Sequence, residues 1–251
     1  MYVIAKWCNS SIGTGLPTAK GRMRDARDLG YEFSAGGTVG VTESKIREEI
    51  CTVGASLYSR RYTVGSAGNI SARLDDGGLI TPTDACLGRL DPNDIAKVGC
   101  DGQHVSGGRP SKTLALHRRI YENSPETRGV VHTHSTNLVA LTLSGVWSID
   151  DIIPPITPYY VMKVGHVPLI KYHRPGAPEV ADQIAVLAPK VRAVLLERLG
   201  PVVWEKTVSA ASFALEELEE TALLWMSLAR SATPLSTDAI DELRNTFGAR
   251  W

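Results

Sequence analysis

The sequence has no excess of charge of either sign, since its 27 basic and 27 acidic residues give a formal net charge of zero. A protein that binds nucleic acid or another polyanion needs a surplus of basic charge on one face, so we expect no such partner. The four cysteines, at positions 8, 51, 86 and 100, lack the Cys-x-x-Cys spacing of common zinc sites. We therefore expect reduced thiols in a cytoplasmic protein.

The chain also lacks a membrane signal at its start, because the segment 1–8 is too short and too interrupted to be a signal-peptide core or a membrane span. We expect no membrane partner. Residues 1–41 carry Gly, Ser, Lys and Arg with scattered apolar residues, which predicts a poorly ordered N-terminal extension or translation from a mistaken upstream start codon. Residues 42–232 are expected to form one domain, followed by a C-terminal tail over 233–251.

Helical and extended patterns alternate along the domain. Thr42 is a plausible N-cap for a helix with apolar residues at positions 46, 50, 53 and 57. Apolar runs predict strands at 79–81, 130–131, 166–170, 193–196 and 201–204, with a helix over about 111–122. A last long helix, starting near Thr207, has a face that we expect to be solvated, formed by Glu216, Glu217, Glu219 and Glu220. This order predicts an α/β layered domain.

Two histidines follow one of the predicted strands. His132 and His134 come directly after the apolar pair Val130-Val131. The two-residue period of an extended chain places both imidazoles on one face, where they favour binding of zinc, iron or copper. The pair therefore indicates half of a metal site, although two unrelated histidines at a polar strand end would give the same pattern.

Further motifs surround this pair, in the order Gly68-Asn69-Ile70-Ser71, Ile80-Thr81-Pro82-Thr83, Arg109-Pro110-Ser111-Lys112, His117, Pro154-Pro155-Ile156-Thr157-Pro158-Tyr159-Tyr160, Tyr172-His173-Arg174-Pro175-Gly176 and Gly200-Pro201-Val202-Val203-Trp204. Over roughly 42–232 this order resembles the class II aldolase/adducin family. Within that family the chain looks most like the 3-oxo-tetronate 4-phosphate decarboxylases, which share the runs 87–92, 157–160 and 172–176. The resemblance implies a three-layer α/β/α domain with a central mixed, mainly antiparallel sheet, assembled as a homotetramer with active sites between subunits.

Phosphate recognition is the first role that the resemblance implies, for Gly68, Asn69, Thr83, Ser111 and Lys112. The chemistry agrees, because glycine lets backbone N–H groups approach a phosphate, the polar side chains can donate hydrogen bonds, and lysine supplies a positive charge. Each residue alone is equally typical of a turn. Asp84 departs from many relatives, which have Gly or Asn there, and its carboxylate would repel a phosphate dianion at close range.

Metal chemistry is the second implied role, and here two positions depart from the family's pattern. Relatives hold zinc with the His-x-His pair and a third histidine, where this chain has Leu199, and they use a glutamate as acid/base, where it has Thr113. Leucine cannot ligate a metal, and a threonine hydroxyl cannot act as a base near neutral pH. We therefore expect zinc or another divalent metal to be weakly held by His132 and His134. His166 is a weaker candidate for a third ligand.

The resemblance implies a metal-dependent lyase that decarboxylates a phosphorylated 3-oxo sugar acid. A β-keto acid loses carbon dioxide directly once its carbonyl is polarised, whereas retro-aldol cleavage must first remove a hydroxyl proton. Replacement of the glutamate should therefore reduce the activity of a decarboxylase less than that of an aldolase. Tyr159 is the proton donor that the resemblance implies, with Tyr160 as the second choice, although either ring would equally suit a subunit contact.

Three alternatives to a fully active decarboxylase stay open at this stage. The replacements at Thr113 and Leu199 would impair catalysis, or the chain would serve as a non-catalytic aldolase-like binding module. A non-heme iron oxygenase, with Asp84 or Glu197 joining the two histidines, is the third.

Overall fold

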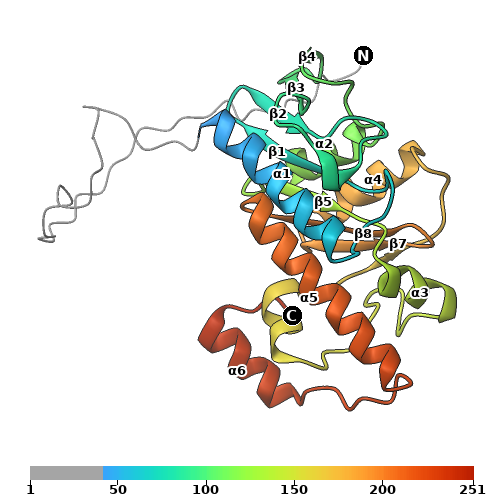
Figure 1. Ribbon diagram of the computed structural model, residues 1–251. Helices are drawn as coiled ribbons and strands as arrows, with labels where there is room; N and C mark the ends of the chain where they lie inside the picture. The colour runs from blue at the N-terminus through green and yellow to red at the C-terminus, as the bar shows by residue number, and fades with distance from the viewer. Residues whose placement is uncertain (1–41) are drawn as a thin grey trace, which may run out of the picture.

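The computed structural model describes residues 42–251, and the predicted extension over 1–41 lies outside the described residues. These residues form one eight-stranded sheet with the order β4-β3-β2-β1-β5-β8-β7-β6 (Figure 1). The strands are β1 (Asn69–Leu74), β2 (Gly77–Ile80), β3 (Ala96–Gly99), β4 (His104–Ser106), β5 (Gly129–His132), β6 (Leu169–Ile170), β7 (Ala193–Leu196) and β8 (Gly200–Glu205). All neighbouring strands are antiparallel except the parallel pair β6 and β7, which confirms the predicted mixed, mainly antiparallel sheet.

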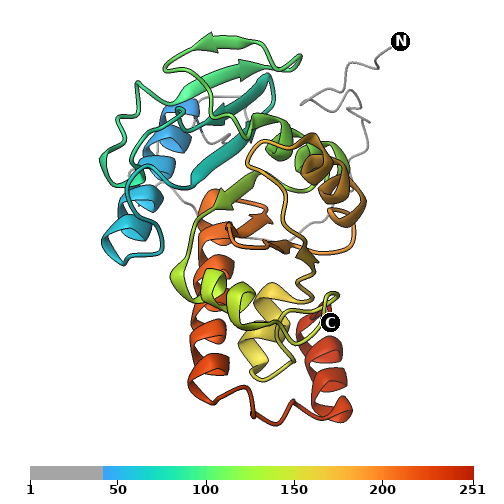
Figure 2. The ribbon, with the colours of Figure 1, turned by 90° about the vertical axis from the view of Figure 1, so that its right-hand side faces the viewer.

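Helices cover both faces of this sheet. The helices of the described residues are α1 (Glu43–Ser59), α2 (Leu114–Asn123), α3 (Thr136–Ser144), α4 (Pro178–Leu187), α5 (Val208–Ser227) and α6 (Thr237–Phe247), with a 3-10 turn η2 (Leu87–Arg89) and a π-helix η3 (Tyr160–Val164). One core cluster holds Leu57 of α1 and Leu215 of α5, and a second holds Ile120 of α2 and Ile184 of α4. Figure 2 shows the two pairs of helices on opposite sides of the sheet, as the three-layer prediction required.

The sequence correctly marks where the two longest helices begin. The Thr42 hydroxyl accepts a hydrogen bond from the Lys45 amide at 3.4 Å, and the Thr207 hydroxyl accepts one from the Ala210 amide at 3.0 Å. Each hydroxyl satisfies one of the backbone donors that a helix start leaves unpaired. The two helices contribute apolar residues to the same core cluster.

The prediction of a solvated glutamate face on α5 is wrong for Glu219. This side chain is 6% exposed, and its carboxylate accepts hydrogen bonds from the Asn137 and Leu138 amides at 2.8 and 3.0 Å. It therefore caps the N-terminus of α3, where Ser135 makes no side-chain cap. Burial raises the pKa of Glu219, against the opposing effect of the two backbone donors. Helical periodicity cannot reveal that a distant helix start needs this acceptor.

The segment predicted as a C-terminal tail contains helix α6, which begins after the N-cap Ser236. Beyond it, the Trp251 ring lies 4.4 Å from the His166 ring and 5.4 Å from the Tyr160 ring, measured between centroids. The C-terminal residues are therefore packed against η3, as the lower part of Figure 1 shows.

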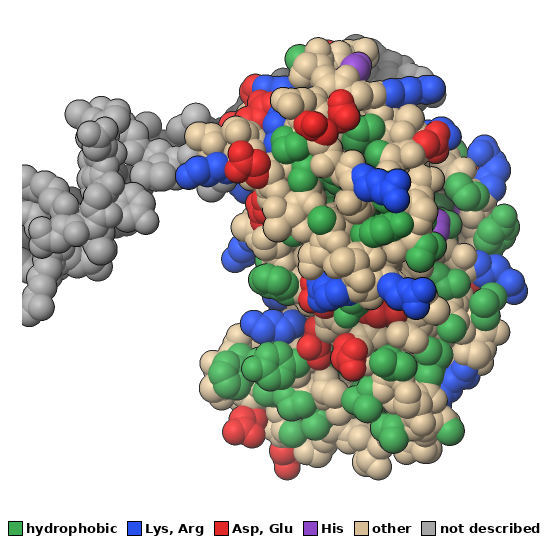
Figure 3. All heavy atoms as spheres, viewed as in Figure 1, with side chains coloured by type: hydrophobic (Ala, Val, Ile, Leu, Met, Phe, Trp, Pro, Cys, Tyr) green, Lys and Arg blue, Asp and Glu red, His purple; other side chains and the backbone are tan. Residues whose placement is uncertain are grey.

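The described helices include no candidate for a membrane span, since none within 42–251 combines the necessary length and apolar character. Cys51 and Cys86 are free thiols, whereas Cys100 is disulfide-bonded, so the expectation of reduced thiols is wrong for Cys100. On the face drawn in Figure 3, basic and acidic side chains are interspersed, so neither sign of charge dominates it.

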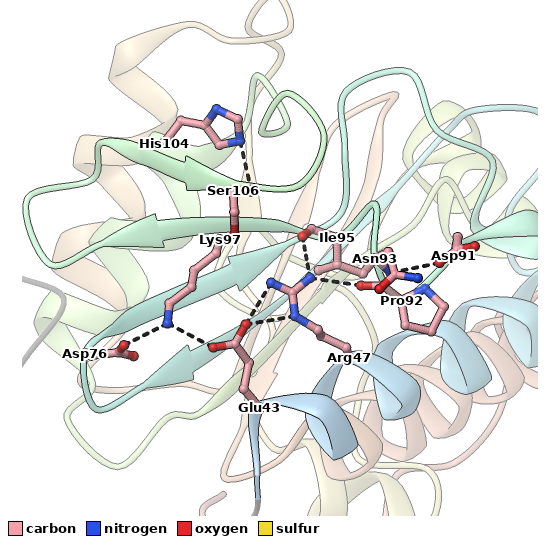
Figure 4. Close-up of polar contacts among 10 residues, drawn as sticks. All are labelled: Glu43, Arg47, Asp76, Asp91, Pro92, Asn93, Ile95, Lys97, His104 and Ser106. Carbon is pink, nitrogen blue, oxygen red and sulfur yellow. Dashed lines mark hydrogen bonds and ion pairs between the residues drawn. The ribbon is translucent and has the colours of Figure 1, made fainter.

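An ion-pair network joins the first turn of α1 to the outer part of the sheet (Figure 4). Lys97 Nζ lies 2.9 Å from the Glu43 carboxylate and 2.7 Å from that of Asp76. Arg47 bonds Glu43 at 2.8 Å and also donates to the carbonyl oxygen of Ile95 at 2.6 Å. Although burial acts to raise it, the hydrogen bonds from Lys97 and Arg47 hold the pKa of Glu43 below its ordinary value.

We expect Glu43→Gln to lower the free energy of unfolding by about 1 kcal/mol at pH 7, the scale of a partly exposed ion pair. Because the folded-state pKa of Glu43 is lowered, its contribution is present above the unfolded pKa and is lost as pH falls through the folded value. The difference between variant and parent should therefore shrink below about pH 4.5. Urea denaturation across pH measures it, with Glu48→Gln on the same helix as control; a difference independent of pH would contradict the assignment.

Candidate active site

A cavity of about 370 Å³ lies where β1 begins and β5 ends. Eight of the nine site residues predicted from the sequence line it, namely Gly68, Asn69, Thr83, Ser111, Lys112, Thr113, His132 and His134. The ninth, Tyr159, does not line the cavity, and its side chain is 60% exposed. The structure therefore joins the residues predicted to bind phosphate and the histidine pair in one place, without Tyr159 of the same chain.

His132 and His134 face the cavity together. Their ring centroids are 5.1 Å apart, and Leu199 lines the same cavity, as the alignment with the family predicted. His132 Nδ1 donates to the carbonyl oxygen of Pro201 at 2.7 Å, so its Nε2 is left as an acceptor or ligand atom. Burial lowers the pKa of His132 to about 4 and also lowers that of His134. Both imidazoles are therefore neutral at pH 7, which is the form that binds a metal.

Within residues 42–251, no histidine, cysteine, aspartate or glutamate completes a three-residue metal site with this pair. Asp84 and Glu197 line the cavity without joining the histidines as ligands. His166, the weaker candidate for a third ligand, lies outside the cavity lining with its Nδ1 2.6 Å from Asp151, so it does not join the pair. The donor set fits a divalent cation held by two imidazoles and completed by water or substrate, one protein ligand fewer than usual for catalytic zinc.

A buried hydrogen-bond chain orients Asn69. His117 Nε2 lies 2.6 Å from Asn69 Oδ1, and His117 Nδ1 lies 2.7 Å from Ser71 Oγ. Burial lowers the pKa of His117 to about 3, so the ring carries one proton at neutral pH. Since Asn69 Oδ1 can only accept, that proton is on Nε2, and the Ser71 hydroxyl donates to Nδ1. The Asn69 NH₂ group is then the donor available to the cavity.

No role for His117 beyond its place in a motif could be inferred from the sequence. Its function depends on a contact 48 positions away along the chain, with Asn69. The apolar spacing of α2 was the only available signal, since it places position 117 on the buried face together with Leu116 and Ile120. A histidine on a buried helix face needs hydrogen-bond partners, but the sequence does not say which ones.

Gly68 and Lys112 both line the predicted phosphate site. Gly68 has φ +83°, and a Cβ atom there would lie 2.7 Å from the carbonyl oxygen of His132. Lys112 Nζ lies 3.5 Å from the Asp84 carboxylate, and both side chains are exposed. Asp84 is therefore placed to pair with Lys112, whereas the sequence had suggested that its carboxylate would repel a phosphate or bind iron.

The fold is that of the class II aldolases. Residues 48–226 match the family described as Class II Aldolase and Adducin N-terminal domain, so the chain belongs to this family. It is 69% identical over 217 residues to the 3-oxo-tetronate 4-phosphate decarboxylase of Cupriavidus necator, covering 84% of this chain and 99% of the relative. The protein of the same name from Escherichia coli K12 is 45% identical over 206 residues, covering 81% of this chain and 97% of the relative.

Solved structures agree with the family match. The crystal structure of YgbL from Klebsiella pneumoniae has a TM-score of 0.78 at 44% identity, covering 82% of this chain and 100% of that one. The resemblance inferred from the motifs is thus confirmed.

Because the Gly68 Cβ position is blocked by backbone, we expect Gly68→Ala to destabilise the fold more than Gly65→Ala. Both glycines have positive φ, but nothing lies within 4 Å of a Cβ at Gly65. Gly65→Ala should cost about 1 kcal/mol for the left-handed backbone alone, and Gly68→Ala at least about 1 kcal/mol more. Urea denaturation compares the two variants. Equal losses would show that β1 can move away from His132 at no cost.

Proposed function

We propose that this chain is a metal-dependent carbon–carbon lyase that decarboxylates a phosphorylated 3-oxo sugar acid of the 3-oxo-tetronate 4-phosphate type. The observation that carries the proposal is one cavity lined both by a neutral imidazole pair and by polar side chains suited to binding a phosphate. The 69% identity to the decarboxylase of Cupriavidus necator, over nearly the whole of that protein, supports the same reaction and substrate class.

The reaction breaks the bond between the carboxylate carbon and C2 of the substrate. The electron pair of that bond moves toward the C3 carbonyl as carbon dioxide leaves, and a proton added at C2 then gives a three-carbon ketose phosphate. When bound by His132 and His134, zinc or another divalent metal supplies Lewis-acid polarisation of the carbonyl. No proton has to be removed to start this reaction, so Thr113 at the acid/base position is compatible with it.

Binding and orientation are the tasks of the remaining cavity residues. The Asn69 NH₂ group, the hydroxyls of Ser111 and Thr83, the backbone at Gly68 and the Lys112 ammonium can surround a phosphate. Thr113 Oγ1 lies 3.0 Å from Ser111 Oγ, so we assign it the role of orienting that hydroxyl. Lys112 would exchange its exposed contact with Asp84 for the phosphate dianion, which carries more charge.

The proposal extends to the assembly and location of the protein. Tyr159 is exposed and does not line the cavity of its own chain, so we place it as proton donor in the cavity of a neighbouring protomer within a homotetramer. Exposed apolar side chains of the preceding segment, Leu143, Trp147 and Ile149, suit burial in such a contact. We expect the enzyme in the cytoplasm, in carbohydrate metabolism.

The three alternatives drawn from the sequence gain no support. A carboxylate would have to join His132 and His134 for an iron oxygenase, and within 42–251 none does. High identity to a protein named for its decarboxylase activity favours neither an impaired enzyme nor a non-catalytic binding module.

We expect Leu199→His to raise the affinity for zinc by at least about tenfold, because it adds a nitrogen ligand beside the existing pair. Leu199→Ala, which opens the same space without a ligand, is the control. Adding Thr113→Glu should raise decarboxylase activity on a 3-oxo-tetronate 4-phosphate further, since it restores an ionisable group. Chelator competition and steady-state kinetics are the measurements. If zinc affinity is the same in the two Leu199 variants, Leu199 does not face the metal position.

Lys112→Ala should weaken binding of a phosphorylated sugar acid by about 1–3 kcal/mol, the scale of a lost charged hydrogen bond. Leu199→Ala should leave this binding nearly unchanged. Titration calorimetry with the phosphorylated and the unphosphorylated sugar acid tests the assignment, because only the first should respond to Lys112. Equal affinity of the parent chain for both ligands would refute a phosphate site in this cavity.

A further inference from the structure

One wall of the cavity has no role in the reaction as described so far. It is formed by the segment after β6 and by the start of α4, and it includes Lys171, His173 and Arg174. The segment is the run Tyr172–Gly176, a motif that the phosphate and metal assignments leave unused. The cavity therefore extends beyond the groups that those two assignments require.

The charges that line the cavity are unequally paired. Lys112 Nζ lies 3.5 Å from Asp84, and Lys171 Nζ lies 3.7 Å from Glu197. Arg174 is the third cation in the lining, and its guanidinium makes no hydrogen bond or ion pair with any residue of the range 42–251. The cavity thus has one positive group without a protein anion.

The backbone that carries Arg174 is held from both sides. The Tyr172 amide donates to the Glu197 carboxylate at 2.8 Å, and the Ala177 amide donates to the carbonyl oxygen of Arg174 at 3.0 Å. Gln183 of α4 donates to His173 Nε2 at 3.0 Å. These bonds fix the turn between β6 and α4, so Arg174 lines the cavity from an anchored segment.

We propose that Arg174 binds the carboxylate of the sugar acid, which gives the cavity a second anion subsite besides the phosphate site at Ser111 and Lys112. The inference rests on the proposed function and deepens it, because a substrate with a phosphate at one end and a carboxylate at the other needs two positive partners. A guanidinium suits the second role, since its planar donors match a carboxylate in a bidentate pair. Lys171 suits this role less, because its ammonium is a point charge without such a planar pair of donors, and it lies 3.7 Å from Glu197.

This pairing predicts a specific kinetic signature. The carboxylate loses its negative charge as carbon dioxide leaves, so the ion pair with Arg174 is weaker in the transition state than in the bound substrate. Removing the guanidinium should then raise KM while kcat stays unchanged or rises slightly. A residue that only supports the structure of the cavity would lower kcat as well.

The test uses the metal-loaded full-length protein and two ligands that cannot be decarboxylated. Erythronate 4-phosphate keeps the carboxylate, whereas erythritol 4-phosphate has a CH₂OH group in its place. Arg174→Gln removes the positive charge, and Arg174→Lys keeps the charge but replaces the planar guanidinium with an ammonium. Lys171→Gln is the matched control, because it removes a cation that lines the same part of the cavity and lies near Glu197. Titration calorimetry gives the affinities, and kinetics with 3-oxo-tetronate 4-phosphate give KM and kcat.

We expect the parent chain to bind erythronate 4-phosphate more tightly than erythritol 4-phosphate. Arg174→Gln should reduce this preference by about ten- to a hundredfold, with little effect on the affinity for erythritol 4-phosphate, and Arg174→Lys should recover part of it. Lys171→Gln should keep the preference. Equal weakening of both ligands, or a preference that survives Arg174→Gln, would overturn the carboxylate subsite while leaving the decarboxylase intact. If the parent chain binds neither ligand and does not turn over the oxo acid, the proposed function itself fails.

Discussion

The site depends on the antiparallel pairing of β1 with β5, which sets Asn69 opposite His132. Two proposed chemical tasks meet at this one register, since β1 begins with Asn69, which we assign to the phosphate, and β5 ends with His132, which we assign to the metal together with His134. A shift by one position would turn Asn69 or His132 to the other face of the sheet. Gly68 allows the close approach, because any Cβ there would meet the His132 carbonyl oxygen.

The same region combines polar groups with nearly complete burial. His117 and His132 are 0% and 4% exposed, which keeps both rings neutral. Each neutral ring carries one proton, on either Nδ1 or Nε2. The partners of that proton, Asn69 for His117 and the Pro201 carbonyl for His132, determine which ring atom remains for other work. Burial therefore determines which donors and acceptors face the cavity. They are the NH₂ group of Asn69, whose oxygen is bonded by His117, and the Nε2 atom of His132, whose Nδ1 is bonded to Pro201.

The parts of this arrangement that were predictable depend on local or periodic signals. Thr42 and Thr207 mark helix starts because a cap acts within three residues, and the His-x-His pair follows from the strand period. Glu219, by contrast, was assigned to solvent because its acceptor role involves backbone amides 81 and 82 positions away. The position of Tyr159 relative to the cavity and the packing of Trp251 against η3 likewise depend on tertiary or quaternary contacts, which no local pattern encodes.

The replacement at Leu199 changes how the proposed substrate would be oriented. With three protein ligands, a metal ion is fixed by the protein and can direct the carbonyl by itself. With two imidazoles, that rigidity has to come from the substrate, which must be held at positions away from the reacting carbonyl. Phosphate binding at Lys112 would fix one end of the molecule so that its central carbonyl lies beside the histidine pair, whereas carboxylate binding at Arg174 would add affinity for the bound substrate. Binding energy from the ends would then replace part of the metal affinity that Leu199 removes, and it is available only to a substrate that carries both anions.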